Sequence, residues 1–211
     1  MIEETPLRRI PQQDRGQRRV DKILDSAAQM FAEVGYEAAT TNAIAARANT
    51  SVGSLYQFFP NKEAILQMLA ARYLDQLRAL HDQVLTAETA QLPLPMLLDS
   101  IIDPLAEFKA AQPGFEPIFF GAHASASLAA AAEELHQTVI RRVDAIFAAR
   151  APALTASQRN LYVTISVAVV EALLPLSESA AELSRAQIIA ETKRLLLVYL
   201  EPVMGFGGED G

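Results

Sequence analysis

Between residues 40 and 62 the chain carries hydroxyl, amide and amine side chains whose types and spacing suit hydrogen bonding to a polar surface. The stretch reads TTNAIAARANTSVGSLYQFFPNK. Ser54 can donate to or accept from several kinds of group, and Gln57 is the side chain of residues 52–59 that can make a bidentate contact. Gly53 has no side chain to hold the backbone away from a partner. Groups of this kind bind and orient, and no recognised nucleophile motif accompanies them.

Two short helices with a polar turn between them must position these groups. Thr41 can cap the first helix, because a threonine oxygen satisfies an amide left unpaired at a helix start. Ser51 is placed to cap the second helix, which the pattern extends over residues 52–59, before Pro60. A helix of about two turns is not stable alone, so it must pack on neighbours. The layout is typical of a helix-turn-helix, which places its second helix in the major groove of DNA.

Helices on either side supply those neighbours. Apolar residues recur on one face from Arg18 to Val34, and Gly35 stands where a C-terminal cap is expected. After Pro60, Asn61 can cap a helix whose apolar positions continue for about five turns. This long helix starts beside the second short helix, so it could transmit a movement of its far end to the DNA-binding segment.

The rest of the chain has a helical pattern broken by proline and glycine, without the alternation of a strand. The predicted helices cover residues 95–111, 116–122, 128–150, 155–177 and 184–203. We therefore predict an all-α fold, in which a three-helix DNA-binding domain precedes a helical bundle. The predicted parts are a flexible arm at 1–14, a helix-turn-helix domain at 15–62, a second helical domain at 63–203 and a flexible tail at 204–211.

Charge is unevenly distributed along the chain. The net charge of −7 and the isoelectric point near 5.0 argue, taken alone, against a nucleic-acid partner. Residues 1–80, however, hold 10 of the 18 Lys and Arg and 9 of the 25 Asp and Glu, a balance of +1, so the remaining residues carry −8. The basic side chains ahead of the first apolar helix are Arg8, Arg9, Arg15, Arg18, Arg19 and Lys22. They could bind phosphates or simply keep the N-terminus solvated, and charge alone does not decide.

Several classes of function are disfavoured. The chain has no cysteine, and its three histidines show no metal-ligand spacing, so we expect neither a metal nor a cofactor. It has no phosphate-binding glycine loop, and we do not expect an enzyme. No run of about 18 apolar residues and no signal-peptide segment occurs, so we expect a cytoplasmic protein without a membrane partner.

Residues 17–66 resemble the TetR family of bacterial transcriptional regulators. The resemblance rests on a first helix that ends in FAEVGY, the pair Thr40 and Thr41, the run SVGSLYQFF and the turn NKE. The rest of the chain resembles the family only in being helical. The family implies a DNA-binding domain followed by a ligand-binding and dimerisation domain.

The resemblance also implies a set of DNA contacts. It assigns phosphate contacts to Thr41, Tyr56 and Lys62, and base edges to residues 52–54. Because glutamine can pair with adenine in a bidentate manner, Gln57 makes adenine the expected direct contact. The full predicted set is Arg18, Arg19, Thr41, Ser51, Val52, Gly53, Ser54, Tyr56, Gln57 and Lys62. Tyr56 could instead pack on the first helix, and the two arginines could be solvated.

In the second domain the family typically encloses a ligand cavity, and binding there alters the separation of two DNA readers. A cluster of aromatic residues around a proline-broken segment is the candidate lining, and it would suit an apolar or aromatic ligand. Its residues are Phe108, Phe115, Phe119, Phe120, His123 and Tyr162. The same residues could be ordinary core.

The last two helices are apolar nearly all round, which indicates burial on two sides. We expect them to pack against the same pair from a second copy in a four-helix interface, although one chain could also bury them centrally. The candidate interface residues are Ile165, Ala168, Ala172, Leu176, Ile188, Leu195 and Tyr199. We therefore predict a homodimeric repressor that a small apolar or aromatic ligand releases from a palindromic DNA operator. The alternative is a helical small-molecule-binding or scaffolding protein without active DNA binding.

Overall fold

The computed structural model describes residues 14–112, 126–176 and 184–204, and every regular element in these ranges is a helix. The predicted all-α fold is confirmed. The chain divides into two compact units, Met1–Gln76 with Gln112–Ala132 and Leu77–Ala111 with Glu133–Gly211. The predicted helix at 116–122 lies outside the described residues, as do the arm up to residue 13 and the tail from residue 205. Met204, which we expected to begin the tail, is the buried last residue of helix α10 (Arg185–Met204).

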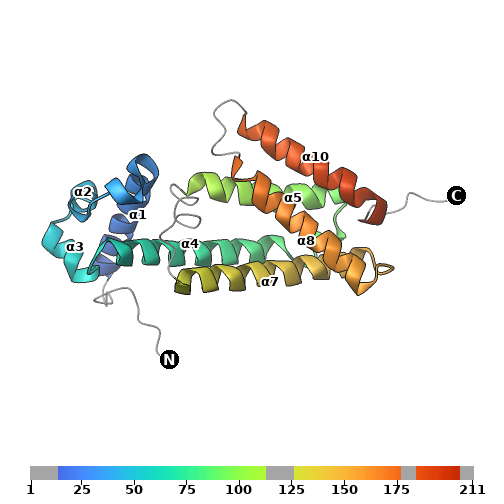
Figure 1. Cartoon of the computed structure of the whole chain (residues 1–211), viewed down its shortest axis with the longest axis horizontal. Coiled ribbons are helices and arrows are strands. Elements are labelled where there is room, and N and C mark those ends of the chain that lie inside the picture. Colours follow the sequence, from blue (N-terminus) through green and yellow to red (C-terminus); the bar gives the residue numbers. More distant parts are fainter. Residues whose placement is uncertain (1–13, 113–125, 177–183, 205–211) are drawn as a thin grey trace. The chain divides into compact units, whose positions relative to one another are not determined.

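In the first unit, α1 (Asp14–Ala38) supplies the apolar face on which the helix-turn-helix packs (Figure 1). The helix is interrupted at Gly35, where φ is 78° and ψ is 164°, a conformation that side chains disfavour. The predicted end at Gly35 is thus a real break, and one further turn follows it to Ala38. The large side chains buried among these helices include Ile23, Phe31, Ile44, Leu55 and Phe59.

The next two helices, α2 (Thr41–Arg47) and α3 (Val52–Phe58), each begin at a capping hydroxyl. Ser51 caps α3 as predicted, because its Oγ accepts the Ser54 N–H at 3.1 Å. The cap of α2 is Thr40 and not Thr41, which corrects our expectation: Thr40 Oγ1 accepts the Ala43 N–H at 3.1 Å. Thr40 has the extended backbone (φ −117°, ψ 149°) that a cap requires. Thr41 is therefore the first helical residue, and its hydroxyl is left for another partner.

Helix α4 (Lys62–Val84) starts directly after this motif and is long, as predicted. Asn61 caps it, with Oδ1 accepting the Ala64 N–H at 2.8 Å. Its first turns join the core of the first unit, and an ion pair of 2.8 Å links Arg72 to Asp25 of α1. Because the two units divide between Gln76 and Leu77, α4 contributes to both. The predicted domain boundary at residue 62 stays a prediction.

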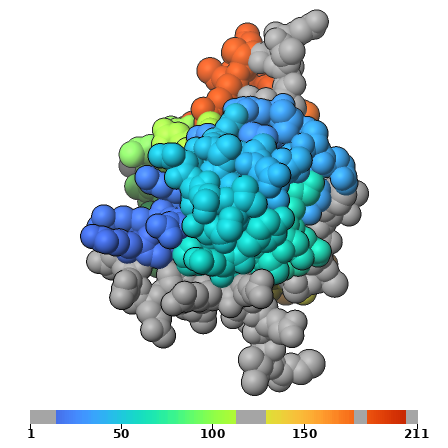
Figure 2. Space-filling view, turned by 90° about the vertical axis from the view of Figure 1, so that its left-hand side faces the viewer, coloured from blue at the N-terminus to red at the C-terminus, as the bar shows by residue number. Residues whose placement is uncertain are grey.

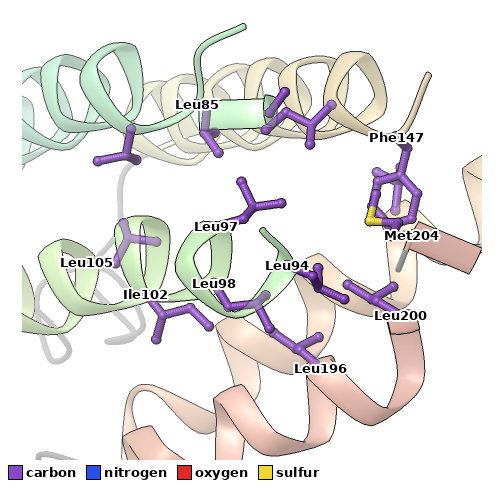
Figure 3. Packing of buried hydrophobic residues seen from close by; sticks show 14 of the residues in the cluster. Leu85, Leu94, Leu97, Leu98, Ile102, Leu105, Phe147, Leu196, Leu200 and Met204 are labelled. Atoms are coloured by element: carbon purple, nitrogen blue, oxygen red, sulfur yellow. The ribbon is translucent and has the colours of Figure 1, made fainter. Parts of the chain in front are cut away.

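An apolar core unites the second unit. It is shared by the end of α4, η1 (Thr89–Gln91), α5 (Leu94–Ala111), α7 (Ala126–Arg150), α8 (Ala156–Leu173) and α10. Helix α5 packs against α10, and Figure 3 shows Leu94 and Leu98 of α5 pointing toward Leu200 and Leu196 of α10. No helix among the described residues is both long and apolar enough to cross a membrane.

Candidate DNA-binding interface

Helix α3 buries one face and exposes the other. Leu55 and Phe58 are buried in the core of the first unit. The exposed residues are Val52, Gly53, Tyr56 and Gln57, and Ser54 is half-buried beside them. In Figure 2 the blue to cyan atoms of α1, α2 and α3 face the viewer, so the view looks onto the helix-turn-helix. An uncharged, partly polar helix face is therefore available to a partner.

The hydroxyl groups of two serines at the start of α3, Ser51 and Ser54, are joined by a hydrogen bond whose donor is Ser51. Ser51 Oγ accepts the Ser54 N–H and donates its own proton to Ser54 Oγ at 2.8 Å. Ser51 is thus occupied as a cap, which leaves little of it for the predicted DNA contact. The Ser54 hydroxyl accepts from within the protein and keeps its proton for an outside acceptor, such as N7 or O6 of guanine or O4 of thymine.

Tyr56 and Thr41, two predicted phosphate contacts, lie together. Tyr56 Oη and Thr41 Oγ1 are 3.1 Å apart, so one hydroxyl donates to the other. The accepting hydroxyl keeps its own proton, which can go to a third acceptor such as a phosphate oxygen. Tyr56 is 40% exposed and its hydroxyl reaches α2, not α1. The pair therefore links α3 to the first turn of α2.

Gly53 lies on the exposed face with open space around it. Apart from the neighbouring residues and the backbone of its own helix, a Cβ built at this position would meet no heavy atom within 4 Å. The fold itself therefore does not require glycine here. A side chain at position 53 would therefore contact only a molecule that approaches α3 from outside the chain.

Lys62 is half-buried at the start of α4, and its phosphate contact stays a prediction. Its Nζ donates to the carbonyl oxygens of Tyr36 at 2.6 Å, Ala39 at 3.0 Å and Glu37 at 3.2 Å. The same atom lies 4.2 Å from the centroid of the Tyr36 ring. An ammonium has three N–H donors, and all three are used. In this arrangement all three donors are directed at carbonyl oxygens of the first unit.

Two exposed arginines lie on α1. Arg18 and Arg19 are exposed, and no hydrogen bond or ion pair involves either of them within the described part of the chain. By contrast, Arg47 at the end of α2 is held by Glu33 of α1 at 2.6 Å, and this hydrogen bond lowers the pKa of the Glu33 carboxyl. The predicted phosphate-binding role therefore stays open for the two α1 arginines.

Of the predicted ligand-lining residues, four lie outside the described residues: Phe115, Phe119, Phe120 and His123. Phe108 is half-buried on α5. Tyr162 lies in an aromatic stack, with its ring centroid 6.3 Å from that of Phe147 and 5.3 Å from that of Tyr199. Buried polar atoms of this unit include His81 Nδ1 and Ser166 Oγ, which have no hydrogen-bond partner among the described residues. Neither residue belongs to a recognised sequence motif, so the sequence offered no signal for them.

The predicted interface residues divide into two groups. Ala168, Ala172, Leu176 and Leu195 are exposed on the single chain, and Ile165 and Tyr199 are half-buried. Ile188, by contrast, is buried within the single chain. Its side chain is therefore not available to contact a second copy, and we remove it from the predicted interface. Within the described residues no group of three or more His, Asp or Glu side chains is placed to hold a metal ion.

Comparison with known proteins places this geometry in a family. Residues 93–200, more than half of the chain, match the family model described as "Tetracyclin repressor-like, C-terminal domain". Residues 23–69 match the model described as "Bacterial regulatory proteins, tetR family".

Individual relatives agree with these matches. The transcriptional repressor KstR2 of Mycolicibacterium smegmatis is 39% identical over 79 residues, which cover 37% of this chain and 38% of that repressor, well under half of its length. A TetR-family regulator from Streptomyces coelicolor superposes with a TM-score of 0.59 at 28% identity, over 90% of this chain and 99% of that one. The SmeT–triclosan complex shares the fold, with a TM-score of 0.65 at 21% identity over 90% of this chain and 93% of SmeT. The chain belongs to the TetR family of bacterial transcriptional regulators.

Proposed function

We propose that this DNA-binding regulator is a homodimeric repressor that reads a palindromic operator and is released from it by a small apolar or aromatic ligand. The observation that carries the proposal is the exposed face of α3 together with the Thr41–Tyr56 hydroxyl pair. That face offers a directed donor at Ser54, a bidentate amide at Gln57 and a backbone open to close approach at Gly53.

Phosphate binding must supply much of the affinity. Within α3 no Arg or Lys is present, so its direct base contacts are few and uncharged. The Thr41–Tyr56 pair can bond a phosphate oxygen, and the exposed arginines of α1 supply positive charge. Affinity should therefore fall steeply with salt, while discrimination between sequences rests on Ser54 and Gln57.

Dimerisation is supported by apolar side chains that the single chain leaves in solvent. Leu161 of α8 is 57% exposed, and Leu195 and Val198 of α10 are 50% and 64% exposed. Ala168 and Ala172 continue the exposed side of α8, and α8 and α10 are in contact. Apolar residues gathered on two adjacent helices suit a symmetric contact with a second copy. Two readers paired in this way would recognise half-sites about 34 to 36 Å apart.

Ligand control is supported by the second unit. His81 Nδ1 and Ser166 Oγ are buried and have no hydrogen-bond partner in the part of the chain that the structure describes. An unpartnered buried polar atom is costly, so a ligand that bonds to one of them gains a specific contact in an apolar setting. The triclosan complex shows that SmeT, a protein of this fold, binds an aromatic compound. A ligand of this chain shifts operator affinity only by its preference for the conformation that does not fit the operator.

Selection of random duplex DNA by the purified protein, sequenced after rounds at two salt concentrations, tests the proposal. We expect enrichment of a palindrome with adenine opposite Gln57, weaker at the higher salt. Gln57→Ala should then relax discrimination at one base pair by about 1 to 3 kcal/mol. The absence of any enriched motif at either salt would contradict operator reading and favour a helical ligand-binding protein without active DNA binding.

A further inference from the structure

We propose that four cations on the exposed side of α1 form one binding surface for the phosphates of duplex DNA, next to the half-site that α3 reads. We call this surface the basic stripe, and its residues are Arg15, Arg18, Arg19 and Lys22. Its place beside a half-site rests on the proposed function, whereas its binding to duplex DNA can be measured on any sequence. The inference adds the two ends of the stripe, Arg15 and Lys22, to the expected DNA contacts.

The spacing of these cations places them on one face of α1. Positions 15, 18, 19 and 22 follow the spacing of one side of a helix, and all four residues are exposed. The opposite side carries Val20, Ile23 and Leu24, which are at most 3% exposed. Because this buried side fixes the rotation of the helix, the four charges must face outward together.

Two acids of α1 that could neutralise the stripe are used by other groups. Asp21 accepts a hydrogen bond from Gln17 at 3.2 Å, and Asp25 pairs with Arg72 of α4 at 2.8 Å. In the part of the chain that the structure describes, no ion pair involves a cation of the stripe. Like charges at this spacing repel one another, so an anion that lies against the stripe is stabilised.

The neighbouring helices indicate which anion the stripe meets. In Figure 2 the deepest blue atoms, those of the start of α1, stand at one edge of the face that shows α2 and α3. Helix α3 supplies polar groups but no Arg or Lys. Arg47, Lys62 and Arg72 of the first unit have hydrogen-bond or ion-pair partners in the chain. Among the described residues of this unit, the unpaired positive charge near α3 is therefore that of the stripe.

A row of phosphates fits the stripe in length and in charge. Seven residues of helix rise by about 10.5 Å, and a phosphate recurs about every 3.4 Å of axis along one strand, so the stripe spans about three phosphates. Guanidinium groups bond phosphate oxygens in a bidentate manner, and the release of counterions adds affinity that does not depend on base sequence. The stripe should therefore raise affinity for all duplexes, while α3 selects the sequence.

Charge removal at the two ends of the stripe tests the proposal. Arg15→Gln and Lys22→Gln keep long, helix-favouring side chains at exposed positions, so the fold should be retained. Each should lower the magnitude of the slope of log affinity against log salt by about 0.9 and weaken binding about fivefold near 0.15 M salt. The effect should be the same on a duplex selected by the wild-type protein and on a random-sequence duplex.

Arg141→Gln is the matched control for these variants. Arg141 is an exposed cation of α7 in the second unit, so the substitution changes the net charge equally but removes no charge from the stripe. It should leave both the affinity and the salt slope unchanged.

Amine labelling of Lys22 measures the contact without a substitution. An amine-specific reagent should modify Lys22 of the full-length protein more slowly once random-sequence duplex is added, and about 1 M salt should abolish this protection. Lys109 of α5 is the control lysine, because it belongs to the second unit and its labelling rate should not change.

The outcomes separate the stripe from the proposed function. Lower slopes for both end variants and protection of Lys22 by DNA support the stripe. Wild-type slopes in both variants, or labelling of Lys22 that duplex DNA leaves unchanged, overturn it even if a palindrome is selected. If no motif is selected while random-sequence duplex still protects Lys22 and both slopes still fall, the proposed operator reading fails and the stripe stands.

Discussion

At the scale of single residues, Gly53 separates the needs of the fold from those of DNA binding. A Cβ here would meet nothing inside the chain. Because glycine in a helix is less favourable than alanine by about 1 kcal/mol, Gly53→Ala should leave the free energy of unfolding unchanged or raise it by up to about that amount. The added methyl group should nevertheless weaken duplex binding, since it lies between the backbone and the groove. Urea unfolding and a duplex titration measure the two effects.

Gly35→Ala is the matched control for that substitution. The position also has open space around a Cβ, but its φ of 78° and ψ of 164° strain any side chain. We expect a loss of about 1 to 3 kcal/mol in the free energy of unfolding. If Gly53→Ala bound DNA as well as the wild type, close approach of the α3 backbone to the base edges would be excluded.

The Thr41–Tyr56 pair should behave as one unit in DNA binding. Thr41→Val and Tyr56→Phe each remove one hydroxyl of the chain of hydrogen bonds, and each should weaken binding to all sequences alike. The double variant should lose less than the sum of the two, with a coupling energy of about 0.5 to 3 kcal/mol. Strict additivity in this double-mutant cycle would mean that the two hydroxyls bind DNA independently or not at all.

Local rules predicted some of these residues and could not predict others. The caps Ser51 and Asn61 followed from the sequence because a cap depends on a residue and its neighbours. Thr40 and Thr41 could not be separated, since both are threonines and only the backbone angles select the cap. The hydrogen bonds of Lys62 are made to carbonyls 23 to 26 residues earlier in the chain, which no local pattern specifies.

At the scale of elements, the end of α4 in the second unit carries a buried histidine that should make stability depend on pH. Burial lowers the pKa of His81 from 6.5 to about 4; the positive Arg142 adds to this effect and Asp82 opposes it. The unfolded chain takes up a proton near pH 6.5 while the folded chain resists until about pH 4. Stability is therefore lost as the pH falls through this window, by about 3 kcal/mol at its lower end.

Urea unfolding at pH 7 and pH 5 measures this loss at fixed protein concentration. His81→Gln should unfold with a smaller difference between the two pH values, because glutamine does not titrate. Other groups also titrate in acid, so the comparison of variant with wild type is the informative quantity. Equal pH dependence in the two proteins would show that His81 is not held neutral in the folded state.

Helix positions followed from sequence more easily than helix orientations. The periodic pattern predicted α5, α7, α8 and α10 to within a few residues, because their ends are marked by residues such as Thr155, which caps α8 through a capping box with Gln158. It could not choose the inward faces of α8 and α10, which are apolar nearly all round. Packing on α5 turns Ile188 and Leu196 inward and leaves Leu195 in solvent.

At the scale of the whole molecule, two linked properties define the proposed regulator: pairing of copies through the second unit and reading of DNA by the first. A palindrome is bound tightly only when both readers engage it, since the second contact is then made at a high effective concentration. Loss of pairing should therefore appear as loss of affinity for the full operator, with little change for a single half-site.

Leu195→Asp tests this link. A carboxylate in the centre of an apolar contact cannot be solvated, so the variant should sediment as a monomer and bind the full palindrome far more weakly than the wild type. Met96→Asp is the matched control, because Met96 is similarly exposed but lies on α5 and not on the exposed side of α8 and α10. It should remain a dimer with unchanged operator affinity. A Leu195→Asp protein that still sedimented as a dimer would place the contact between copies elsewhere on the chain, and the half-site spacing inferred from it would have to be abandoned.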